Sequence, residues 1–271
     1  MPELPEVETI KRDLSILIGS PLKAIIVYDE AYLEKNEITP KELKKLEGQK
    51  LLQLSRKGKY LFFHFSKHIF GFHLGLTGSL ILLAVENPHD NFKHKVLSLN
   101  FLEMSLLFSD MRKFGRLFLF DEEKSFQNFL INIGQDALEI GLSEFKEALK
   151  SIGKPIKSAL LDQKVISGIG NIYADEILFR AGINPLRPAR SLSDEELQKL
   201  YQTMKEVLHL AIQLRGSTIK DYVDGLGRAG MFQAKHLVYQ KYGKPCPRCG
   251  ATLEKIKVAG RTTCYCPQCQ R

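Results

Sequence analysis

Four cysteines near the C-terminus constrain this chain more than any other feature. They form two pairs, Cys246-Pro-Arg-Cys249 and Cys266-Pro-Gln-Cys269, with sixteen residues between the pairs. Two Cys-x2-Cys pairs at this spacing are typical of a zinc ribbon, in which four thiolates close a tetrahedral site. Because four protein ligands leave no open position, we expect Cys246, Cys249, Cys266 and Cys269 to hold one structural zinc ion.

The segment between the two cysteine pairs is long enough for a β-hairpin, and its tip should fall near residues 258–261. The fifth cysteine, Cys264, breaks the two-residue spacing, so we expect it in a hairpin strand rather than on the metal. Arg261 lies at the predicted tip beside Gly260. This arginine could reach into DNA or remain a solvated surface side chain, and the ribbon by itself does not decide between them.

The net charge of +8 is concentrated at one end of the chain. Residues 215–271 contain eleven Lys and Arg against three Asp and Glu, a difference of +8, so residues 1–214 are neutral overall. A basic end on a neutral body favours an anionic partner, and nucleic acid is the default candidate. The alternative is charge that serves solubility alone.

The start of the chain argues against secretion. Glu3, Glu6 and Glu8 fall within the first eight residues, whereas a signal peptide begins with a basic segment and an apolar core. The most apolar stretch, residues 60–85, contains histidines, a lysine and glycines that make a membrane span costly, and we interpret it as two or three buried strands. We therefore expect a cytoplasmic protein without a membrane segment, in which clustered cysteines bind metal.

Hydrophobic periodicity divides the chain into parts. Apolar residues at helical spacing predict a helix over residues 5–18, with Pro5 suited to its first turn. Short β-rich runs follow, at a spacing typical of a sandwich or barrel. These runs cover residues 22–28, 50–55, 60–65, 69–74, 79–85, 95–101, 104–109 and 116–120. We expect residues 1–122 to form an N-terminal helix plus a β-sandwich.

Helical patterns dominate after Asp121. They cover residues 124–132, 143–151, 156–166, 172–181 and 193–214, the last opening with the capping-box pair Ser193 and Glu196. Residues 123–214 should therefore form a helical domain. A loop rich in Gly and polar residues, 217–232, precedes the cysteine module, so residues 215–271 should hold a loop and the zinc ribbon. The predicted fold class is α+β with several domains.

The N-terminus offers a possible nucleophile. Initiator methionine is normally removed before a residue as small as Pro2, which leaves a secondary amine at the start of the chain. The pKa of an unperturbed α-amino group is only about 7.7 to 8, so a useful fraction is unprotonated at neutral pH. Attack on a sugar C1′ would give an iminium, and Glu3 could transfer protons during ring opening. Alternatively, Pro2 and Glu3 simply start a helix.

Several motifs occur in one order along the whole chain. They are Pro2-Glu-Leu-Pro-Glu-Val-Glu-Thr9, Lys57-Gly-Lys-Tyr-Leu61, His73-Leu-Gly-Leu-Thr-Gly-Ser79, Asp110-Met-Arg-Lys-Phe-Gly115, Gly168-Ile-Gly-Asn-Ile-Tyr-Ala-Asp175, Val258-Ala-Gly-Arg-Thr262 and the cysteine pairs. This set closely resembles the bacterial formamidopyrimidine-DNA glycosylase family. The resemblance implies a helix-two-turn-helix in the helical domain and damaged double-stranded DNA as the partner of a monomer.

The resemblance also implies a mechanism. Pro2 would attack C1′ of the damaged nucleotide, Glu3 would assist as general acid/base, and Lys59 would be a further catalytic basic residue. Arg261 aligns with the arginine implicated near the phosphate. Family members release 8-oxoguanine and formamidopyrimidines in base excision repair, form a Schiff base, and break the strand by β- and δ-elimination.

Taking a base out of a duplex leaves a gap that must be filled. Leu76, Arg112 and Phe114 align with the family's void-filling residues, two as an apolar wedge and a stacking ring, and the arginine as a partner for the orphaned base. The chain departs from the common pattern here. Leu76 stands where methionine is frequent, and Met111 and Lys113 replace Pro and Arg.

The other DNA contacts implied by the resemblance lie along the chain. Asn171, in the glycine-rich turn, should contact a phosphate. Lys154 and Lys157 should both add charge, without a choice of which one contacts DNA. His94 should be the DNA-contacting histidine, with Lys93 as the alternative. The loop from 217 to 231 resembles the flexible cap over the flipped base, with Lys220 and Tyr222 as base contacts. Tyr239 is a further DNA-binding candidate, although Gln240 after it stands where glycine is usual.

Two other functions remain possible from the sequence. The related endonuclease VIII type prefers oxidised pyrimidines, but its members continue differently after the catalytic dipeptide, and Leu4-Pro5-Glu6-Val7-Glu8 favours the purine branch. A non-catalytic zinc-ribbon DNA-binding protein would be expected to lack Pro2, Glu3 or Lys59. All three are present.

Overall fold

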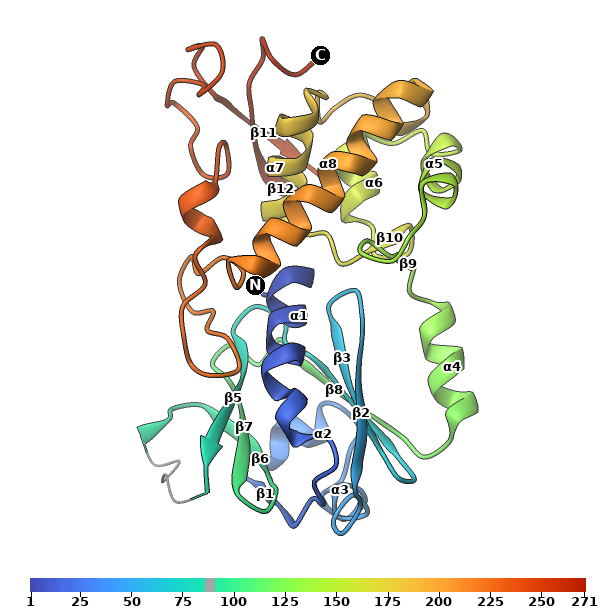
Figure 1. Cartoon of the computed structure of the whole chain (residues 1–271), viewed down its shortest axis with the longest axis vertical. Coiled ribbons are helices and arrows are strands. Elements are labelled where there is room, and N and C mark those ends of the chain that lie inside the picture. The colour runs from blue at the N-terminus through green and yellow to red at the C-terminus, as the bar shows by residue number, and fades with distance from the viewer. Residues whose placement is uncertain (86–90) are drawn as a thin grey trace. The chain divides into compact units, whose positions relative to one another are not determined.

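The computed structural model describes residues 1–85 and 91–271 (Figure 1). The chain forms two compact units, Met1–Ile131 with Leu214–Met231, and Asn132–Gln213 with Phe232–Arg271. The chain thus leaves the first unit after Ile131, returns to it at Leu214 and leaves it again after Met231. The domain boundaries at residues 122 and 214 stay a prediction. They divide the chain into continuous segments, whereas each of the two units combines residues from separate parts of the chain.

Unit 1 contains the predicted β-sandwich. Its two four-stranded sheets have the strand orders β1-β6-β7-β5 and β2-β3-β4-β8, and every pair of neighbours is antiparallel. The strands are β1 (Ala24–Val27), β2 (Leu51–Lys57), β3 (Tyr60–Phe65), β4 (Ile69–His73), β5 (Gly78–Ala84), β6 (Lys95–Asn100), β7 (Met104–Asp110) and β8 (Arg116–Phe120). Each predicted β-rich run is therefore a strand.

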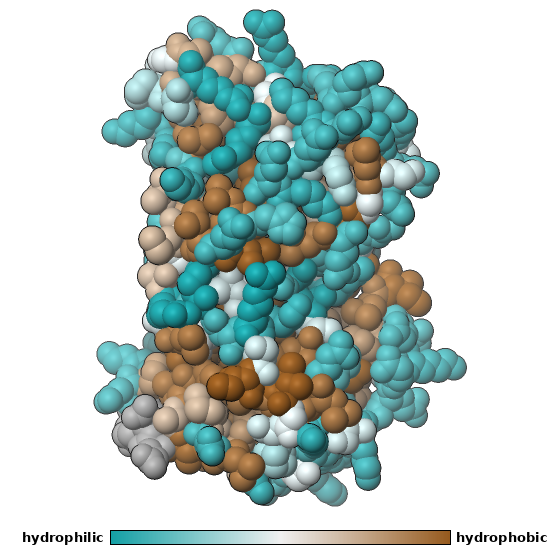
Figure 2. Space-filling view, in the orientation of Figure 1, coloured by the Kyte–Doolittle hydropathy of each residue, from teal (hydrophilic) through white to brown (hydrophobic). Residues whose placement is uncertain are grey.

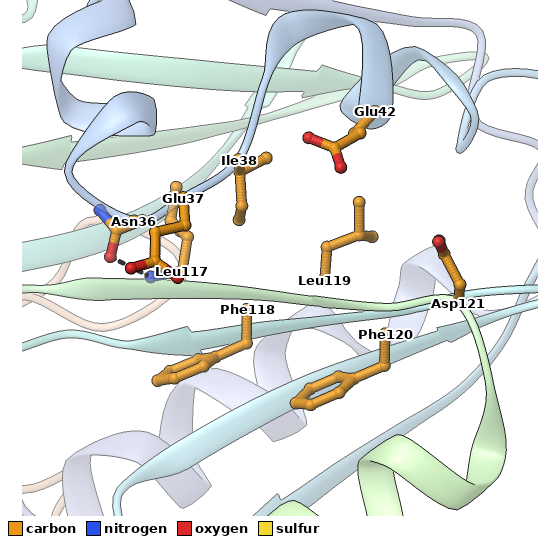
Figure 3. A pocket seen from close by; sticks show the side chains of 9 residues that line it. All are labelled: Asn36, Glu37, Ile38, Glu42, Leu117, Phe118, Leu119, Phe120 and Asp121. Carbon is orange, nitrogen blue, oxygen red and sulfur yellow. Dashed lines mark hydrogen bonds between the residues drawn. The ribbon is translucent and has the colours of Figure 1, made fainter.

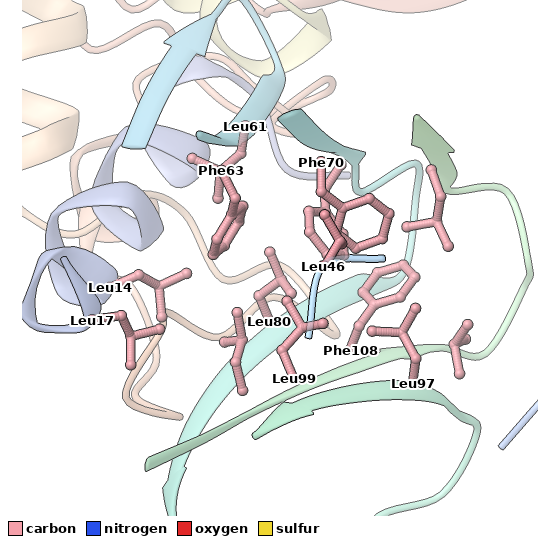
Figure 4. Close-up of a cluster of buried hydrophobic side chains, with 14 of the residues drawn as sticks. Leu14, Leu17, Leu46, Leu61, Phe63, Phe70, Leu80, Leu97, Leu99 and Phe108 are labelled. Atoms are coloured by element: carbon pink, nitrogen blue, oxygen red, sulfur yellow. The ribbon is translucent and has the colours of Figure 1, made fainter. Parts of the chain in front are cut away.

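The core of unit 1 lies between the two sheets (Figure 4). Phe63 and Phe70 from one sheet face Leu80, Leu99 and Phe108 from the other, and all five are fully buried. Burial of these large side chains supplies the main driving force for closing the sandwich. Helix α1 (Leu4–Asp13) and the 3-10 helix η1 (Leu14–Leu17) add their apolar face to the same core.

Two short helices of unit 1 were not predicted. They are α2 (Glu30–Glu34) and α3 (Pro40–Lys44), each of five residues, which is too short for a helical period to appear in the sequence. Their start signals are present all the same. The Asp29 side chain accepts a hydrogen bond from the Tyr32 N–H, and Thr39 forms a capping box with Glu42.

The outer face of the sheet β2-β3-β4-β8 is aromatic and is covered by α4 (Glu123–Ile131). Phe126 of α4 lies 4.9 Å from Phe62 between ring centroids, and Phe129 lies 4.8 Å from Phe118, in tilted or edge-on arrangements that aromatic pairs favour. Gly71 in β4 makes this packing possible. A Cβ at that position would meet the Phe62 ring at 2.8 Å.

Unit 2 contains four of the five helices predicted after Asp121, whereas the first of them, α4, lies in unit 1. The four in unit 2 are α5 (Leu142–Lys150), α6 (Ile156–Leu161), α7 (Asn171–Ala181) and α8 (Asp194–Gln213), with 3-10 turns η3 (Ala189–Ser191) and η4 (Phe232–Lys235). The predicted capping box is confirmed, since the Ser193 N–H donates to Glu196 and the Glu196 N–H donates to the Ser193 hydroxyl. The prediction of one helix over 156–166 is too long. Asp162 turns the chain by accepting the Lys164 N–H, and the short strand β10 (Ile166–Ser167) follows, paired in parallel with the earlier strand β9 (Gln135–Asp136).

The C-terminal hairpin matches the prediction. Strands β11 (Glu254–Val258) and β12 (Arg261–Tyr265) are antiparallel, and Val258 pairs with Arg261 across a two-residue turn. Both turn residues, Ala259 and Gly260, have positive φ angles, 50° and 70°, as a tight hairpin turn that follows the twist of its strands requires. Arg261 therefore begins the return strand directly beside the tip.

The surface has an apolar region on unit 1 (Figure 2). The exposed large apolar side chains of unit 1 include Ile16, Ile18, Ile26 and Leu52. Among the residues that the structure describes, no helix is both long enough and apolar enough to cross a membrane.

Candidate functional site

The start of α1 holds the predicted nucleophile and its acid/base partner. Pro2 is buried, and Glu3 is only 2% exposed at the N-cap of the helix. The Glu3 N–H donates to the carboxylate of Glu6 at 2.8 Å, which fixes the backbone at the dipeptide. Glu6 was not among the predicted site residues, although its capping-box spacing from Glu3 was visible in the sequence.

Glu6 also binds the loop that the sequence suggested as a cap. The Ser217 N–H donates to Glu6 Oε1 at 2.7 Å, and Gly216 has a positive φ of 81° where a Cβ would meet Glu6 at 2.6 Å. A single buried carboxylate thus connects the N-terminal dipeptide to the segment Leu214–Met231 of the same unit. This connection does not depend on a flexible side chain at the surface, because Glu6 is 1% exposed.

Tyr222, a predicted base contact, lies in the core of unit 1 instead of on its surface. It is 8% exposed, and its hydroxyl donates to the Arg215 carbonyl at 3.1 Å and to the Glu6 carbonyl at 3.5 Å. Burial and the nearby Glu6 carboxylate raise the pKa of Tyr222, so it stays a protonated donor. Its position supports the loop, whereas Lys220 in the same loop is exposed and available to a ligand.

The base of the same loop is held by ion pairs. The Arg215 guanidinium donates to Asp13 on α1 and to Asp224 within the loop, both at 2.5 Å. Arg228 donates to Asp224 at 3.1 Å. Because Asp13 belongs to α1, the loop is attached to this helix near both of its ends.

Lys59 lies in the turn between β2 and β3 and is 7% exposed. Arg56 positions this turn, since its guanidinium donates to the Gly58 carbonyl at 2.8 Å and to Glu8 on α1 at 3.0 Å. Burial would raise the pKa of Glu8, but hydrogen bonds from Arg56 and Arg12 outweigh it and hold the pKa below its ordinary value. The ionised Glu8 therefore links the turn of Lys59 to the helix that begins at the Pro2-Glu3 dipeptide.

His73, at the end of β4, shares this environment. Burial, and then the positive charge of Lys59, lowers the pKa of His73 to about 4. The neutral ring accepts the Gly75 N–H at its Nδ1 at 3.3 Å and lies 4.8 Å from the Tyr60 ring. His73 stands in a motif that carried the family resemblance, but it was not proposed as a site residue.

The three predicted void-filling residues come from two neighbouring loops of unit 1. Leu76 is half-buried, while Arg112 and Phe114 are exposed. The Arg112 guanidinium lies 4.9 Å from the Phe114 ring, a cation–π contact between the predicted base partner and the predicted stacking ring. The loops approach backbone to backbone, because a Cβ on Gly75 would lie 2.5 Å from the Phe114 carbonyl carbon.

The two alternatives for the DNA-contacting histidine are both exposed. His94 and Lys93 precede β6, and His94 has a positive φ of 56°. The His94 carbonyl accepts the Asp110 N–H at 3.0 Å. Both residues are available to a ligand, so the choice between them stays open.

Unit 2 brings three further predicted residues to one cavity of about 670 Å³. Asn171, Tyr239 and Arg261 line it, together with Asp175, Gln240, Tyr242, Gly260, Thr262 and Cys264. Asn171 is the first residue of α7, where the helix dipole favours an anion. An exposed arginine, an amide and a helix N-terminus around one hollow are the groups that bind a phosphate.

Lys157, one of two lysines considered for DNA contact, lies below this cavity. It is fully buried, and its ammonium donates to Asn171 at 2.7 Å, Asp175 at 2.6 Å and Thr263 at 2.7 Å. In this conformation its ammonium is bonded to these acceptors and orients Asn171. Lys154 is 39% exposed and paired with Asp162, so it is the lysine of the two that a phosphate could approach.

Asp175, the carboxylate that faces Lys157, was not singled out from the sequence. Burial raises its pKa to about 6, against the effect of the Lys157 ammonium and of the Cys264 N–H at 3.1 Å. The only feature of the sequence that pointed to Asp175 was its place at the end of the motif from Gly168 to Asp175. The motif led us to expect a phosphate-binding turn, but not a buried ion pair beneath it.

The four predicted zinc ligands lie together. The Sγ atoms of Cys246, Cys249, Cys266 and Cys269 all lie within 4.8 Å of one another, with 3.8 Å between Cys246 and Cys269 and 3.6 Å between Cys249 and Cys266. A tetrahedron with zinc–sulfur bonds of about 2.3 Å has edges of about 3.8 Å, so the cluster fits zinc. Cys264 is buried in β12, as predicted, and pairs with Lys255.

A smaller cavity of about 230 Å³ lies beside β8 (Figure 3). Leu119 and Ile38 point toward it, whereas Phe118 and Phe120 point to the opposite side of the strand. None of the predicted site residues lines it. We therefore place the candidate site at the N-terminal dipeptide and its loops in unit 1, and at the Asn171–Arg261 cavity in unit 2.

Family models match the chain over most of its length. Residues 1–117 match the formamidopyrimidine-DNA glycosylase N-terminal domain, residues 133–223 its H2TH domain, and residues 243–271 a zinc finger found in FPG and IleRS. The chain is 41% identical to the formamidopyrimidine-DNA glycosylase of Carboxydothermus hydrogenoformans over 100% of both chains. It belongs to the formamidopyrimidine-DNA glycosylase family.

Other relatives agree with this assignment. The formamidopyrimidine-DNA glycosylase of Bacillus subtilis is 37% identical, over 100% of this chain and 99% of its own. A Lactococcus lactis structure with Fapy-dG-containing DNA has a TM-score of 0.90 and 36% identity over 100% of both chains, and another with abasic-site DNA has a TM-score of 0.89. The chain is thus a DNA glycosylase with the mixed α/β fold of this family and one structural zinc.

Replacing a zinc ligand should release the metal, whereas replacing the fifth cysteine should not. We expect about one zinc per chain in the native protein and in Cys264→Ser, and substantially less in Cys246→Ser, because three thiolates cannot close the tetrahedron. Metal analysis of the purified proteins measures this. Equal loss of zinc from both variants would place Cys264 on the metal.

His73 should make the protein less stable in acid. The unfolded chain binds a proton at this ring below its ordinary pKa of 6.5, but the folded chain does so only below about 4, so stability falls as the pH decreases through this window. Between pH 8 and pH 5 the native protein should lose about 2 kcal/mol more unfolding free energy than His73→Gln. Urea unfolding followed by circular dichroism measures the difference. His209→Gln, at an exposed position of α8, is the control and should behave like the native protein.

Proposed function

We propose that this chain is a bifunctional DNA glycosylase and abasic-site lyase that excises oxidised purines, 8-oxoguanine and formamidopyrimidines, from duplex DNA. Pro2, freed of Met1, is the nucleophile in this proposal. The chain would act in the cytoplasm as a monomer. The proposal builds on membership of the family, and its finer parts concern the lyase step, the lesions and the residues.

One observation carries the proposal. The dipeptide Pro2-Glu3 starts a buried helix, and the carboxylate of Glu6 binds both the Glu3 N–H and the Ser217 N–H of the glycine-rich loop. A terminal amine held beside a loop is an arrangement suited to attack on a nucleotide that the loop covers. The Lactococcus lactis relative, at 36% identity, has been solved with Fapy-dG-containing DNA and with abasic-site DNA.

The chemistry follows from the secondary amine. The Pro2 nitrogen attacks C1′, the bond from C1′ to the base breaks, and the base leaves with a proton. Glu3 serves as general acid/base while the sugar ring opens to an iminium. The iminium accepts the electrons released when a proton leaves C2′, which expels the 3′ phosphate, and a second elimination expels the 5′ phosphate. We propose Lys59 and Arg261 as the basic residues that assist these eliminations.

DNA binding would use the exposed and half-buried groups described above. Leu76, Arg112 and Phe114 would fill the gap left by the flipped base. Asn171, Tyr239, Lys154, Lys220 and either His94 or Lys93 would bind the strands. We propose that Lys157 and Tyr222 act indirectly, through Asn171 and through the cap loop, because both are buried.

Oxidised pyrimidines are a second candidate substrate class. The observation that favours them is a Lactococcus lactis relative solved with oxidised-pyrimidine-containing DNA, at a TM-score of 0.88 and 36% identity. A non-catalytic DNA-binding role is disfavoured, since Pro2, Glu3 and Lys59 are all present.

A panel of lesions tests the proposal. The untagged, Met1-processed protein should cleave duplexes that contain 8-oxoguanine or a formamidopyrimidine, and should leave a gap with a phosphate at each end, as β,δ-elimination requires. Gel analysis of both labelled strands identifies these ends. Protein with an extra N-terminal residue, which blocks the amine, is the control and should not cleave.

Each other result has a distinct meaning. Faster cleavage of an oxidised pyrimidine would favour the second substrate class. Base release without strand cleavage would remove the lyase activity. Zinc-loaded protein that binds DNA but leaves every lesion intact would favour the non-catalytic role.

A further inference from the structure

The buried carboxylate of Asp110 lies at the end of β7 and is 1% exposed. It accepts three hydrogen bonds: from the Thr77 hydroxyl at 2.6 Å, the Gly115 N–H at 2.8 Å and the Tyr32 hydroxyl at 3.1 Å. A carboxylate is retained in a protein interior when donors replace its lost water, and these three donors do so. Asp110 is not one of the residues expected to touch DNA.

Two of these donors belong to the loops that carry the void-filling residues. Thr77 directly follows Leu76, and Gly115 directly follows Phe114. The Thr77 hydroxyl also accepts the Arg112 N–H at 3.0 Å, so it joins the second loop to the first. Leu76 and Phe114 therefore each precede a residue that donates to Asp110, and Arg112 itself donates to Thr77.

The backbone of Asp110 extends the same network. Its N–H donates to the His94 carbonyl at 3.0 Å, and its carbonyl accepts the Lys113 N–H at 3.3 Å. Lys113 has a positive φ of 53°, and its ammonium pairs with Asp29 at 2.5 Å. The segment before β6 is thus attached to the same residue as both void-filling loops.

The hydrogen bonds to Asp110 add to the order that the neighbouring strands give the two loops. At Gly75 the backbones are so close that a Cβ would lie 2.5 Å from the Phe114 carbonyl carbon. The strands on either side of the loops are paired, His73 with Arg116 and Gly78 with Asp110, so the sheets fix the ends of both loops. Directional bonds to one shared carboxylate order the residues between those ends.

Tyr32 connects this carboxylate to the core of unit 1. Its ring is 1% exposed and meets Phe108 edge-on at 5.7 Å. Burial and the Asp110 carboxylate raise the pKa of Tyr32, which keeps the hydroxyl protonated as a donor. Tyr32 therefore attaches the Asp110 carboxylate to the core, and both loops are hydrogen-bonded to a group that buried residues hold.

We propose that Asp110 is a positioning residue that holds Leu76, Arg112 and Phe114 as one rigid element for insertion into a duplex. This inference rests on the proposed function, since it concerns the gap that base flipping leaves. Insertion offsets the free-energy cost of separating stacked bases only if the inserted groups are already in place. Asp110 supplies this order without touching the DNA.

The test is Asp110→Asn, which keeps the size of the side chain and removes one of its acceptor atoms. An amide nitrogen cannot accept from Thr77, Gly115 or Tyr32, so at least one buried donor loses its partner. We expect kcat/KM on a lesion-containing duplex to fall about tenfold to a hundredfold. Cleavage of an abasic site in a single-stranded oligonucleotide, which has no stacked partner strand to wedge apart, should change less than about twofold.

Two further variants sharpen the test. Thr77→Val should lower duplex activity in the same direction, and the double variant should be no worse than Asp110→Asn alone, because both act through one network. Asp136→Asn is the matched control, since Asp136 is also a carboxylate 1% exposed but lies in unit 2 and binds the Leu138 N–H. It should leave the ratio of duplex to single-strand activity unchanged.

The outcomes separate this inference from the proposed function. A native protein that cleaves no lesion would overturn the proposed function and this inference with it. With an active native protein, an Asp110→Asn variant of native duplex activity would overturn the inference alone. An equal loss on both substrates would also overturn it, because that result describes general damage to the fold.

Discussion

The buried carboxylate of Glu6 is the interaction on which the candidate site depends. Proline has no side-chain donor by which a protein could hold its terminal amine, so the position of Pro2 must be set through the backbone that follows it. Glu6 does this by accepting the Glu3 N–H, and it accepts the Ser217 N–H with its other oxygen. Because it is 1% exposed, neither bond competes with bulk water. The helix start and the cap loop are therefore one structural element.

Buried carboxylates hold other loops of the described chain in the same way. Asp110 binds the loops of Leu76 and Phe114, Asp175 binds the hairpin at the Cys264 N–H, and Glu176 accepts the backbone N–H groups of Val238 and Tyr239. Each carboxylate is 2% exposed or less. The hydrogen bonds to a buried carboxylate are strongly directional, whereas apolar packing tolerates small shifts. Zinc plays the corresponding part in the ribbon, where the four thiolates fix the turns that flank the hairpin.

Helices and strands long enough to show a hydrophobic period could be predicted from the sequence. The eight strands, α1, α7 and α8 follow from periodicity and capping, and the zinc site follows from cysteine spacing, because these signals are local. The helices α2 and α3 were too short to show a period, and the end of α6 at Leu161 depends on a turn at Asp162. Among site residues, the sequence could not show that Lys157 and Tyr222 are buried. Their burial comes from partners distant in the chain, Thr263 and Glu6, which only the fold brings to them.

The measurement that tests the central claim most directly is borohydride trapping on a duplex with 8-oxoguanine opposite cytosine, followed by peptide mapping of the adduct. The protein is untagged and free of Met1, and Pro2→Gly accompanies it as a variant that keeps a terminal amine but replaces the secondary amine by a primary one. This account predicts a covalent protein-DNA band in which peptide mapping finds the DNA attached to Pro2. A band that maps to Lys59 or another lysine, or no band from folded, zinc-loaded and DNA-binding protein, would contradict the claim that the terminal proline is the nucleophile.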